Sequence, residues 1–389
     1  MRVDIYRLGL YLQLLILDRA GNLMTGGAAD IRVAILPGVP WRPAIAAHQP
    51  GAAPDPLAMY RLMAEAGVSV DIIDPYPWPA NPFARSNQLY RGLDLVRAAD
   101  VLFRHRQRYD LILTVFESSA VFPLLLRRLS AAAPLVGIWD VDLTDWRPRK
   151  WVQRIVLPRV DHLFVLSTYQ IRLLKEQWNR QDGVHFVGQH IDTDFYRPDP
   201  DAEEDGSILA IGEDAGRDFA TLFAAASDFP APLVIKSKRR LEIPAGLHGR
   251  VRQISDWLDW RALRRLYAAC RLVVVPLHTT GNVSGVGSTL EAMAMAKPLV
   301  VSDNPAMVDY LQDGQTCLVV PPHDPAALAR AVNRLLADPA EARRLGQRAR
   351  AFVTERHAQP VFARQFAETL KSAVAAARSA RTPGYRLAG

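Results

Sequence analysis

The chain has 389 residues, of which 49% are hydrophobic, and its formal net charge is +7 at pH 7. This length suits two domains of ordinary size, and no apolar run reaches the roughly 20 residues of a membrane-spanning helix. Two cysteines are too few for a disulfide framework and have no zinc-site spacing with histidine, which is typical of a reduced, cytoplasmic protein. The positive charge suits anionic partners. No nucleic acid is expected, because long basic tracts interleaved with aromatic residues are absent from the sequence.

Residues 1–30 differ in pattern from the rest of the chain. Arg2 and Arg7 precede the apolar run 8–17, which is too short to span a membrane. We interpret the segment as an extension outside the core, either a mis-assigned start or an interfacial anchor. The pattern of a globular domain begins at Ile31.

Short apolar runs alternate with segments of helical spacing in the first half of the chain. Helical spacing covers 55–66 and 89–103, and another helix is expected to end at Leu129. The predicted strands are Ile31–Leu36, Val68–Ile73, Leu111–Val115, Leu135–Trp139 and His162–Leu166. Strands that alternate with helices indicate a parallel sheet covered on both faces.

The same alternation restarts after an acidic, proline-containing stretch at 199–206, which is the best candidate for a linker. The later predicted strands are Ser207–Gly212, Leu233–Lys236, Val251–Gln253, Leu272–Pro276 and Leu299–Val301. An α/β protein with two Rossmann-like, doubly wound parallel-sheet domains is therefore expected. The domains would span 31–198 and 199–353 and face a cleft. Ligands of such sheets bind at the carboxyl ends of the strands.

The segment 285–301 is the most informative part of the sequence. Gly285 and Gly287 open a short helix, Glu291 lies one turn inside it, and Lys297-Pro298 then leads into a strand. A helix N-terminus offers free N–H groups and a positive dipole end to a diphosphate. The carboxylate of Glu291 can accept two hydrogen bonds from a ribose diol. The segment predicts half of a nucleotide-sugar pocket.

Together with its flanking strands and helices, this segment resembles the carboxy-terminal domain of the family 4 (group 1) glycosyltransferases, which have the GT-B fold. The resemblance extends from about Ile31 to about Leu370. Residues 187–198 are similar to the family's Gly-Val-Asp-x-x-x-Phe-x-Pro crossover signature, with His190 where glycine is usual. The family's last helix crosses back to the first domain, and residues 354–389 are expected to form this helix, over about 354–374, and a loose tail.

The resemblance implies a donor site in the second domain. Gly212 matches the glycine that closes the first strand of this domain in the family. Glu213 occupies the position where the family has an arginine, and Arg217 lies near the position of the family's lysine. Val283 replaces the first of two family glutamates. Arg217, Lys236 and the helix start would bind the diphosphate, and Glu291 the ribose. The implied donor-binding residues are Gly212, Arg217, Lys236, Asn282, Ser284, Gly285, Gly287, Ser288, Thr289 and Glu291.

Glu117 and Asp140, at strand ends of the first domain, are candidates to touch the acceptor or donor, so the predicted catalytic residues are Arg217, Lys236, Glu117 and Asp140. The family's histidine in this domain is not evident. The pairs Asp140/Asp142 and Asp192/Asp194 spell the metal-binding pattern of GT-A enzymes, but in a GT-B layout no metal and no other cofactor are expected. Two interpretations of His278 stay open, namely a residue of the donor site or a polar residue of a loop.

The resemblance implies a retaining glycosyltransferase that moves a sugar from a nucleotide diphosphate to a hydroxyl, with the donor β-phosphate accepting the proton. Bacterial glycan, polysaccharide or glycolipid synthesis is expected, with a glycan or lipid-linked acceptor. Basic clusters at 104–108, 127–128 and 147–150 are solvated helix ends, or they dock on the anionic inner face of the membrane. The alternatives are a non-catalytic nucleotide-sugar-binding scaffold, favoured by Val283 and Glu213, and a GT-B sugar phosphorylase.

Overall fold

A computed structural model describes residues 29–77, 80–84, 92–104, 109–129, 133–143 and 147–381. Most of the expected N-terminal extension, the cluster residues 105–108 and the end of the expected tail lie outside these ranges. Within them, no helix is both long and apolar enough to cross a membrane.

The first domain is built on a six-stranded, all-parallel sheet with the order β2-β1-β3-β4-β5-β6. Its strands are β1 (Ile31–Leu36), β2 (Val68–Ile72), β3 (Leu111–Val115), β4 (Leu135–Trp139), β5 (His162–Val165) and β6 (Val184–Phe186). Its α-helices are α2 (Arg42–Ala46), α3 (Ala58–Glu65), α5 (Leu95–Ala99), α6 (Val121–Leu126), α7 (Arg147–Val156) and α8 (Thr168–Trp178). The central strands β3 and β4 are buried along their whole length, as expected for a sheet covered on both faces.

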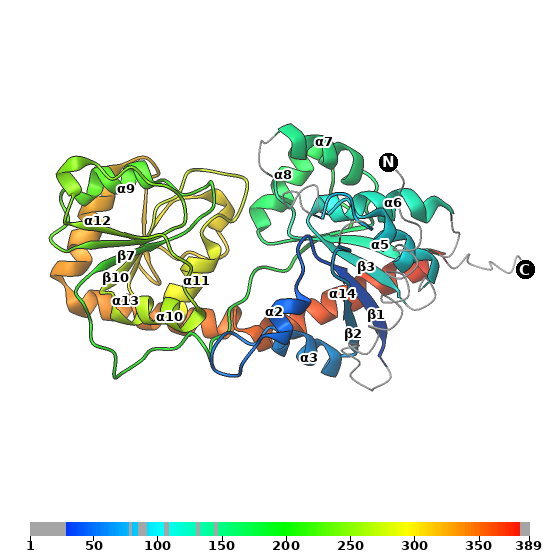
Figure 1. Ribbon diagram of the computed structural model, residues 1–389, viewed down its shortest axis with the longest axis horizontal. Coiled ribbons are helices and arrows are strands. Elements are labelled where there is room, and N and C mark those ends of the chain that lie inside the picture. Colours follow the sequence, from blue (N-terminus) through cyan, green and yellow to red (C-terminus); the bar gives the residue numbers. More distant parts are fainter. Residues whose placement is uncertain are drawn as a thin grey trace, which may run out of the picture.

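The second domain repeats this plan with the order β12-β11-β10-β7-β8-β9, again all parallel. Its strands are β7 (Ile208–Ile211), β8 (Leu233–Lys236), β9 (Val251–Ile254), β10 (Leu272–Val275), β11 (Leu299–Ser302) and β12 (Leu318–Val320). Its helices are α9 (Phe219–Ala226), α10 (Trp260–Ala269), α11 (Val286–Ala294), α12 (Pro325–Ala337) and α13 (Pro339–Arg356). Two doubly wound domains are therefore present, and Figure 1 shows them side by side.

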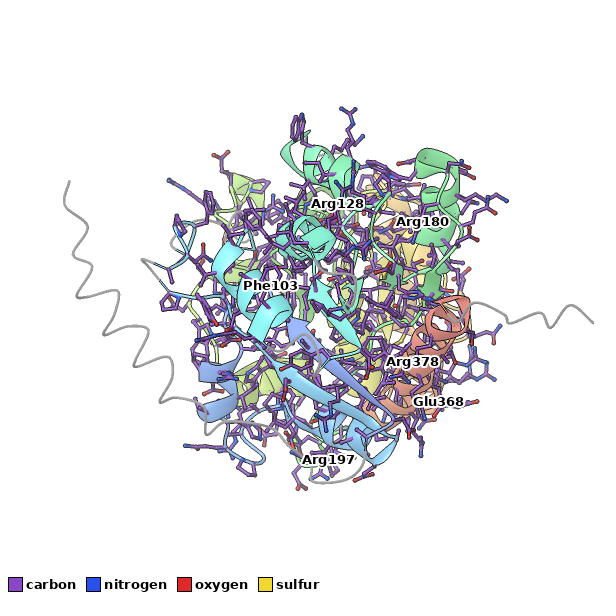
Figure 2. The ribbon with its side chains drawn as sticks, turned by 90° about the vertical axis from the view of Figure 1, so that its right-hand side faces the viewer. Phe103, Arg128, Arg180, Arg197, Glu368 and Arg378 are labelled. Atoms are coloured by element: carbon purple, nitrogen blue, oxygen red, sulfur yellow. The ribbon has the colours of Figure 1, made fainter. Side chains whose placement is uncertain are left out.

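The last helix, α14 (Gln359–Arg381), returns to the first domain, where it packs against α3 and β2. Phe362 stacks on Trp139 and Phe366 packs on it at a tilt, with ring centroids 6.2 and 5.1 Å from that of Trp139. The ring of His190 lies 4.5 Å from that of Phe362, so the histidine at the usual glycine position packs on the returning helix. Arg378, labelled in Figure 2, pairs with Asp110 near the far end of α14.

Two helix boundaries differ from the sequence expectation. Residues 89–91 of the helix expected over 89–103 lie outside the described residues, and its remainder contains a short α-helix, Leu95–Ala99, followed by a π-helical turn, Asp100–Arg104. The returning helix begins at Gln359 instead of residue 354, because α13 continues to Arg356 and Ala358 forms a bridge to Ile191. The helical pattern on both sides of this break is similar, so periodicity alone does not locate it. Residues 199–206 contain no helix or strand, which fits a linker.

Candidate functional site

The N-terminus of α11 lies at the carboxyl edge of the second sheet. Gly285 precedes the helix with φ +82°, and a Cβ there would lie 2.8 Å from Val275, so this close packing requires glycine. No side chain in the described part of the chain caps the helix start. A Cβ on Gly287 would meet nothing within 4 Å. The first N–H groups of the helix are therefore next to open space that an anion can fill.

Arg217 points its guanidinium at this helix start. Its Nη2 donates to Ser288 Oγ (2.9 Å), and its Nε donates to the Asp214 carboxylate (2.8 Å). Its Nη1 has no hydrogen-bond partner among the described residues, although the residue is only 5% exposed. A buried, charged donor without a partner is costly, which indicates that an anionic ligand completes its bonding. Residue 212 must be glycine here, since a Cβ would lie 2.2 Å from Arg217 Nε.

Glu291 lies on α11 between two tyrosines. Its carboxylate oxygens accept hydrogen bonds from the hydroxyl groups of Tyr196 (3.2 Å) and Tyr267 (2.6 Å). Desolvation raises the pKa of Glu291, and the two tyrosine bonds oppose that rise. Each carboxylate oxygen has two lone pairs, so a ribose diol can still bind to a carboxylate held in this way.

Lys236 ends β8, beside the end of β7. Its ammonium group lies 3.5 Å from Glu213, which is also 3.8 Å from the ammonium group of Lys238. Glu213 thus partly neutralises both lysines at the position where the family resemblance leads us to expect an arginine. Of the predicted diphosphate cations, Arg217 is the one whose side chain donates a hydrogen bond to a residue at the start of α11 within the described part of the chain.

The other predicted donor-site residues have varied surroundings. Ser288 Oγ donates to the Gly285 carbonyl (3.1 Å) while it accepts from Arg217, so it positions the arginine. Thr289 is fully buried, and its side chain does not reach the surface. Ser284 lies against Gly216, where a Cβ would be 2.3 Å from its hydroxyl oxygen. Val283, which replaces the family glutamate, is buried in the core.

Asn282 connects the two domains. Its Oδ1 accepts from the backbone N–H of Leu143 (2.8 Å), and its Nδ2 donates to the Asp142 carboxylate. Both polar atoms of this predicted sugar ligand therefore contact the first domain in this structure. The role of Asn282 as a donor ligand stays a prediction.

Asp309 forms a second contact between the domains. Its carboxylate accepts from the backbone N–H of Thr168 (2.8 Å) and from the hydroxyl groups of Ser167 (3.1 Å) and Thr168 (2.8 Å). A carboxylate of the second domain is thus placed at the N-terminus of α8 in the first domain, where the helix dipole favours negative charge. The hydroxyl group of the next residue, Tyr310, donates to the Leu166 carbonyl.

Glu117 and Asp140 follow neighbouring strands but have different environments. Glu117 is 0% exposed and accepts from the Asp142 N–H and the Gln153 amide (both 3.0 Å), with Arg149 at 3.6 Å. Burial raises the pKa of Glu117 to about 7. The carboxylate of Asp140 has no hydrogen bond or ion pair with a described residue, and burial raises its pKa to about 6. Asp140 is the more accessible of the two, and Glu117 is placed to position its neighbours.

Both strand ends have an uncommon backbone. Phe116 and Asp140 have φ values of +67°, which is rare for residues other than glycine. Such conformations cost free energy and cluster at functional sites, because they aim side chains in directions that a relaxed backbone does not. This geometry makes the carboxyl edge of the first sheet a candidate acceptor side.

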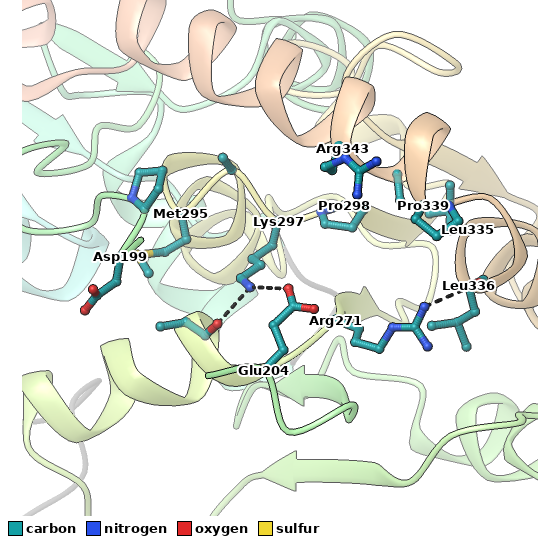
Figure 3. A pocket seen from close by; sticks show the side chains of 14 residues that line it. Asp199, Glu204, Arg271, Met295, Lys297, Pro298, Leu335, Leu336, Pro339 and Arg343 are labelled. Atoms are coloured by element: carbon teal, nitrogen blue, oxygen red, sulfur yellow. Dashed lines mark hydrogen bonds and ion pairs between the residues drawn. The ribbon is translucent and has the colours of Figure 1, made fainter. Parts of the chain in front are cut away.

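Lys297, from the Lys-Pro pair after α11, has a structural role. Its ammonium group donates to the carbonyls of Ala268 and Cys270 (both 2.8 Å), at the C-terminus of α10, and pairs with Glu204 of the linker (3.3 Å). Lys297 and Glu204 line a separate pocket of about 280 Å³, and Figure 3 shows the two side chains there. A cation at a helix C-terminus is favourable, so Lys297 ties the linker to α10.

Comparisons with known proteins show which family and which fold the chain is similar to. Residues 220–338 match the family model described as "Glycosyl transferases group 1". Over 94 residues, 24% of this chain, the sequence is 31% identical to D-inositol 3-phosphate glycosyltransferase from Streptomyces bingchenggensis (strain BCW-1). This match spans 18% of the length of that relative.

Solved structures with the same fold cover most of the chain. Sucrose-phosphate synthase from Thermosynechococcus elongatus superposes with a TM-score of 0.69 at 20% identity, over 89% of this chain and 100% of that chain. The Anabaena protein HepE in complex with UDP-glucose gives 0.64 at 15% identity, over 88% of this chain and 100% of that chain. The predicted GT-B fold is confirmed, and the match of residues 220–338 to the group 1 model agrees with the resemblance seen in the sequence.

Proposed function

We propose, from the group 1 glycosyltransferase domain and the GT-B fold of this chain, that it is a glycosyltransferase that takes a sugar from a nucleotide-diphosphate donor. The observation that carries the proposal is the Arg217 guanidinium, which is buried against the start of α11 and has one nitrogen without a hydrogen-bond partner among the described residues. One turn along the same helix, Glu291 presents a carboxylate to a ribose. The diphosphate and the ribose of a nucleotide diphosphate are thereby matched by Arg217 with the start of α11 and by Glu291 within α11.

Arg217 and the first N–H groups of α11 stabilise negative charge that develops on the diphosphate as the glycosidic bond breaks. These groups are already in place, so little reorganisation is needed during the reaction. Lys236, at the end of β8, adds positive charge, and the nearby Glu213 carboxylate partly neutralises that charge. Asp140 faces the acceptor hydroxyl, while Glu117 holds the Asp142 backbone and Gln153 in position.

The transfer proceeds with retention of anomeric configuration, and the β-phosphate of the donor accepts the proton of the acceptor hydroxyl. The proposal is supported by the family resemblance and by the burial of Glu117, which separates it from a reacting hydroxyl. No metal or other cofactor is needed for this step. The acceptor is a glycan or a lipid-linked glycan of a bacterial pathway, and the basic surface of the first domain allows docking on the inner face of the membrane.

A nucleotide screen by thermal unfolding tests the proposal. Wild-type protein is unfolded with UDP, GDP, ADP and dTDP, and a nucleotide at about 100 times its dissociation constant adds about 2.7 kcal/mol of stability. Glu291→Gln should lose most of this gain, since a neutral acceptor binds a ribose diol more weakly than a carboxylate does. Glu355→Gln, at an exposed position of α13, is the matched control.

Turnover then separates the alternatives. Release of nucleotide diphosphate that depends on an acceptor supports the transferase, while a requirement for inorganic phosphate would identify a phosphorylase. If none of the four nucleotides changes the unfolding temperature, the donor site proposed here is wrong.

A further inference from the structure

Three side chains from different loops meet at the carboxyl edge of the second sheet. Asp218 follows β7, His278 follows β10 and His323 follows β12. The Nδ1 atoms of His323 and His278 lie 2.9 and 3.7 Å from the same Asp218 oxygen, Oδ2. One potential ligand atom from each of the three residues lies within 4.8 Å of the other two.

These separations suit a divalent transition metal. A tetrahedral ion with bonds of about 2.0–2.1 Å to histidine nitrogen and carboxylate oxygen places its ligand atoms about 3.3 Å apart. The observed 2.9 and 3.7 Å bracket this distance. Two imidazoles and one carboxylate form a donor set that binds zinc and neighbouring transition metals in preference to the hard cations magnesium and calcium.

The backbone holds these three residues in place. The His278 N–H donates to the Gly216 carbonyl (2.8 Å), and the Asp218 N–H donates to the Pro276 carbonyl (3.1 Å), which fastens two of the loops together. His323 has φ +59° and directly follows Pro321-Pro322, so its loop is stiff. A site whose ligand loops are fixed in advance loses little entropy when it binds an ion.

The capping role of Asp218 does not explain the histidines. Its carboxylate accepts from the Thr221 N–H (3.0 Å) and the Thr221 hydroxyl (2.6 Å) at the start of α9. This cap needs neither imidazole. The same two bonds orient the carboxylate, as outer partners do around bound metals. The His278 and His323 side chains are 42% and 59% exposed, which leaves room for water on the metal.

We propose that Asp218, His278 and His323 form a binding site for one zinc-like divalent metal ion, whose remaining positions are open to water. The site goes beyond the proposed sugar transfer, for which no metal is needed at the diphosphate. A bound ion would cross-link the loops after β7, β10 and β12, and the first of these loops carries Arg217. The sequence does not reveal this cluster because its members are 60 and 45 residues apart, at positions 218, 278 and 323.

Direct metal titration tests the proposal. The full chain is freed of metal with a chelator and titrated with Zn²⁺ in competition with a chromophoric chelator, and Co²⁺ serves as a spectroscopic probe of coordination. We expect one high-affinity equivalent in the wild type. The His278→Ala/His323→Ala double variant should bind at least about 100-fold more weakly, because it loses two ligands where loss of one outer partner already costs about 10- to 100-fold.

Two further variants keep the test decisive. Asp218→Asn retains a good helix cap but loses the anionic ligand, so it should weaken zinc binding without changing the unfolding curve recorded in chelator. His248→Ala removes an exposed histidine from another loop and should bind zinc like the wild type. Absence of zinc uptake by the wild type at micromolar concentration, or equal affinity of the wild type and the double variant, would overturn the proposal.

Discussion

The guanidinium of Arg217 occupies the space that a side chain on Gly212 would need. A Cβ on residue 212 would lie 2.2 Å from Arg217 Nε and 2.4 Å from its Cζ. The absence of a side chain at Gly212, after β7, therefore allows the Arg217 side chain from the following loop to reach the start of α11. The family resemblance implies a glycine at position 212, and the position of Arg217 explains why a larger residue does not fit there.

Gly212→Ala should displace Arg217 and weaken donor binding. Loss of hydrogen bonds from a charged group costs about 1.5–3 kcal/mol, which corresponds to a roughly 10- to 100-fold fall in kcat/KM for the nucleotide sugar. Steady-state kinetics would measure it. The control is Gly246→Ala, since a Cβ at that position meets nothing within 4 Å and φ is not positive. Wild-type kinetics in Gly212→Ala would show that Arg217 does not serve the donor.

Gly287→Ala tests the open space at the start of α11. In the free protein the new methyl group meets nothing within 4 Å, so the unfolding temperature should stay the same or rise slightly. If the diphosphate binds at this helix start, the methyl group would occupy part of its site, and nucleotide affinity should fall by tenfold or more, about 1.4 kcal/mol. Calorimetric titration with the nucleotide found in the thermal screen measures the affinity. Unchanged affinity would place the diphosphate elsewhere.

Glu117 should make stability depend on pH. Its pKa in the folded protein is about 7, above the ordinary value of 4.5, because burial disfavours the charged form more than Arg149 favours it. The folded state thus holds the proton more tightly than the unfolded state. Its stabilising contribution is complete below about pH 4.5 and is lost as the pH rises through about 7. Burial raises the pKa of Asp140 to about 6, which acts in the same direction.

Glu117→Gln should remove most of this dependence. The neutral amide can still accept from the Asp142 N–H, while the charge that costs free energy above pH 7 is gone. Relative to the variant, the wild type should lose up to about 3 kcal/mol of unfolding free energy between about pH 4 and pH 8, at about 1.4 kcal/mol per pKa unit. Urea unfolding across this range measures it. Parallel pH curves for the two proteins would contradict the raised pKa.

The parts of the fold that follow from local sequence were predictable. Among the strands in the described part of the chain, β1, β3, β4 and β8 have bounds that agree with the predicted runs, since short apolar stretches between turn residues are strong local signals. The Gly285–Glu291 segment was likewise identified because helix start, glycine and carboxylate are adjacent in the chain. Helix ends were less predictable, as the break before Gln359 shows.

Contacts between distant residues could not be predicted in this way. Tyr196 and Tyr267, which hold Glu291, are 95 and 24 residues away from it, and no local pattern connects them. Tyr196 directly follows the Phe of the crossover signature, and this neighbourhood is the only hint of its role. Similarly, Asn282 has the polarity expected of a sugar ligand, yet its partners lie in the other domain.

Asp309→Ala should loosen the two domains. Asp309 accepts three hydrogen bonds from Ser167 and Thr168 at the start of α8, and the side chains of Ser167 and Thr168 lose their interdomain acceptor when the carboxylate is removed. The helix start becomes accessible to water and Ser167 still caps it, so each domain should stay folded. The fraction of open molecules should rise, because a helix N-terminus loses a favourable carboxylate worth about 0.3–1 kcal/mol in addition to its hydrogen bonds.

Small-angle scattering of the free protein would detect the opening as a larger radius of gyration, and kinetics would show a higher KM for both substrates, since the open form must close before transfer. Asp309→Asn is the informative companion variant: its amide oxygen can still accept from the Thr168 N–H, so its effect should be intermediate. Asp201→Ala, an exposed carboxylate in the linker region, serves as the control. An unchanged radius of gyration and KM in Asp309→Ala would show that the contact forms without contributing to closure, and closure would then depend on Asn282 and the Tyr310 hydroxyl.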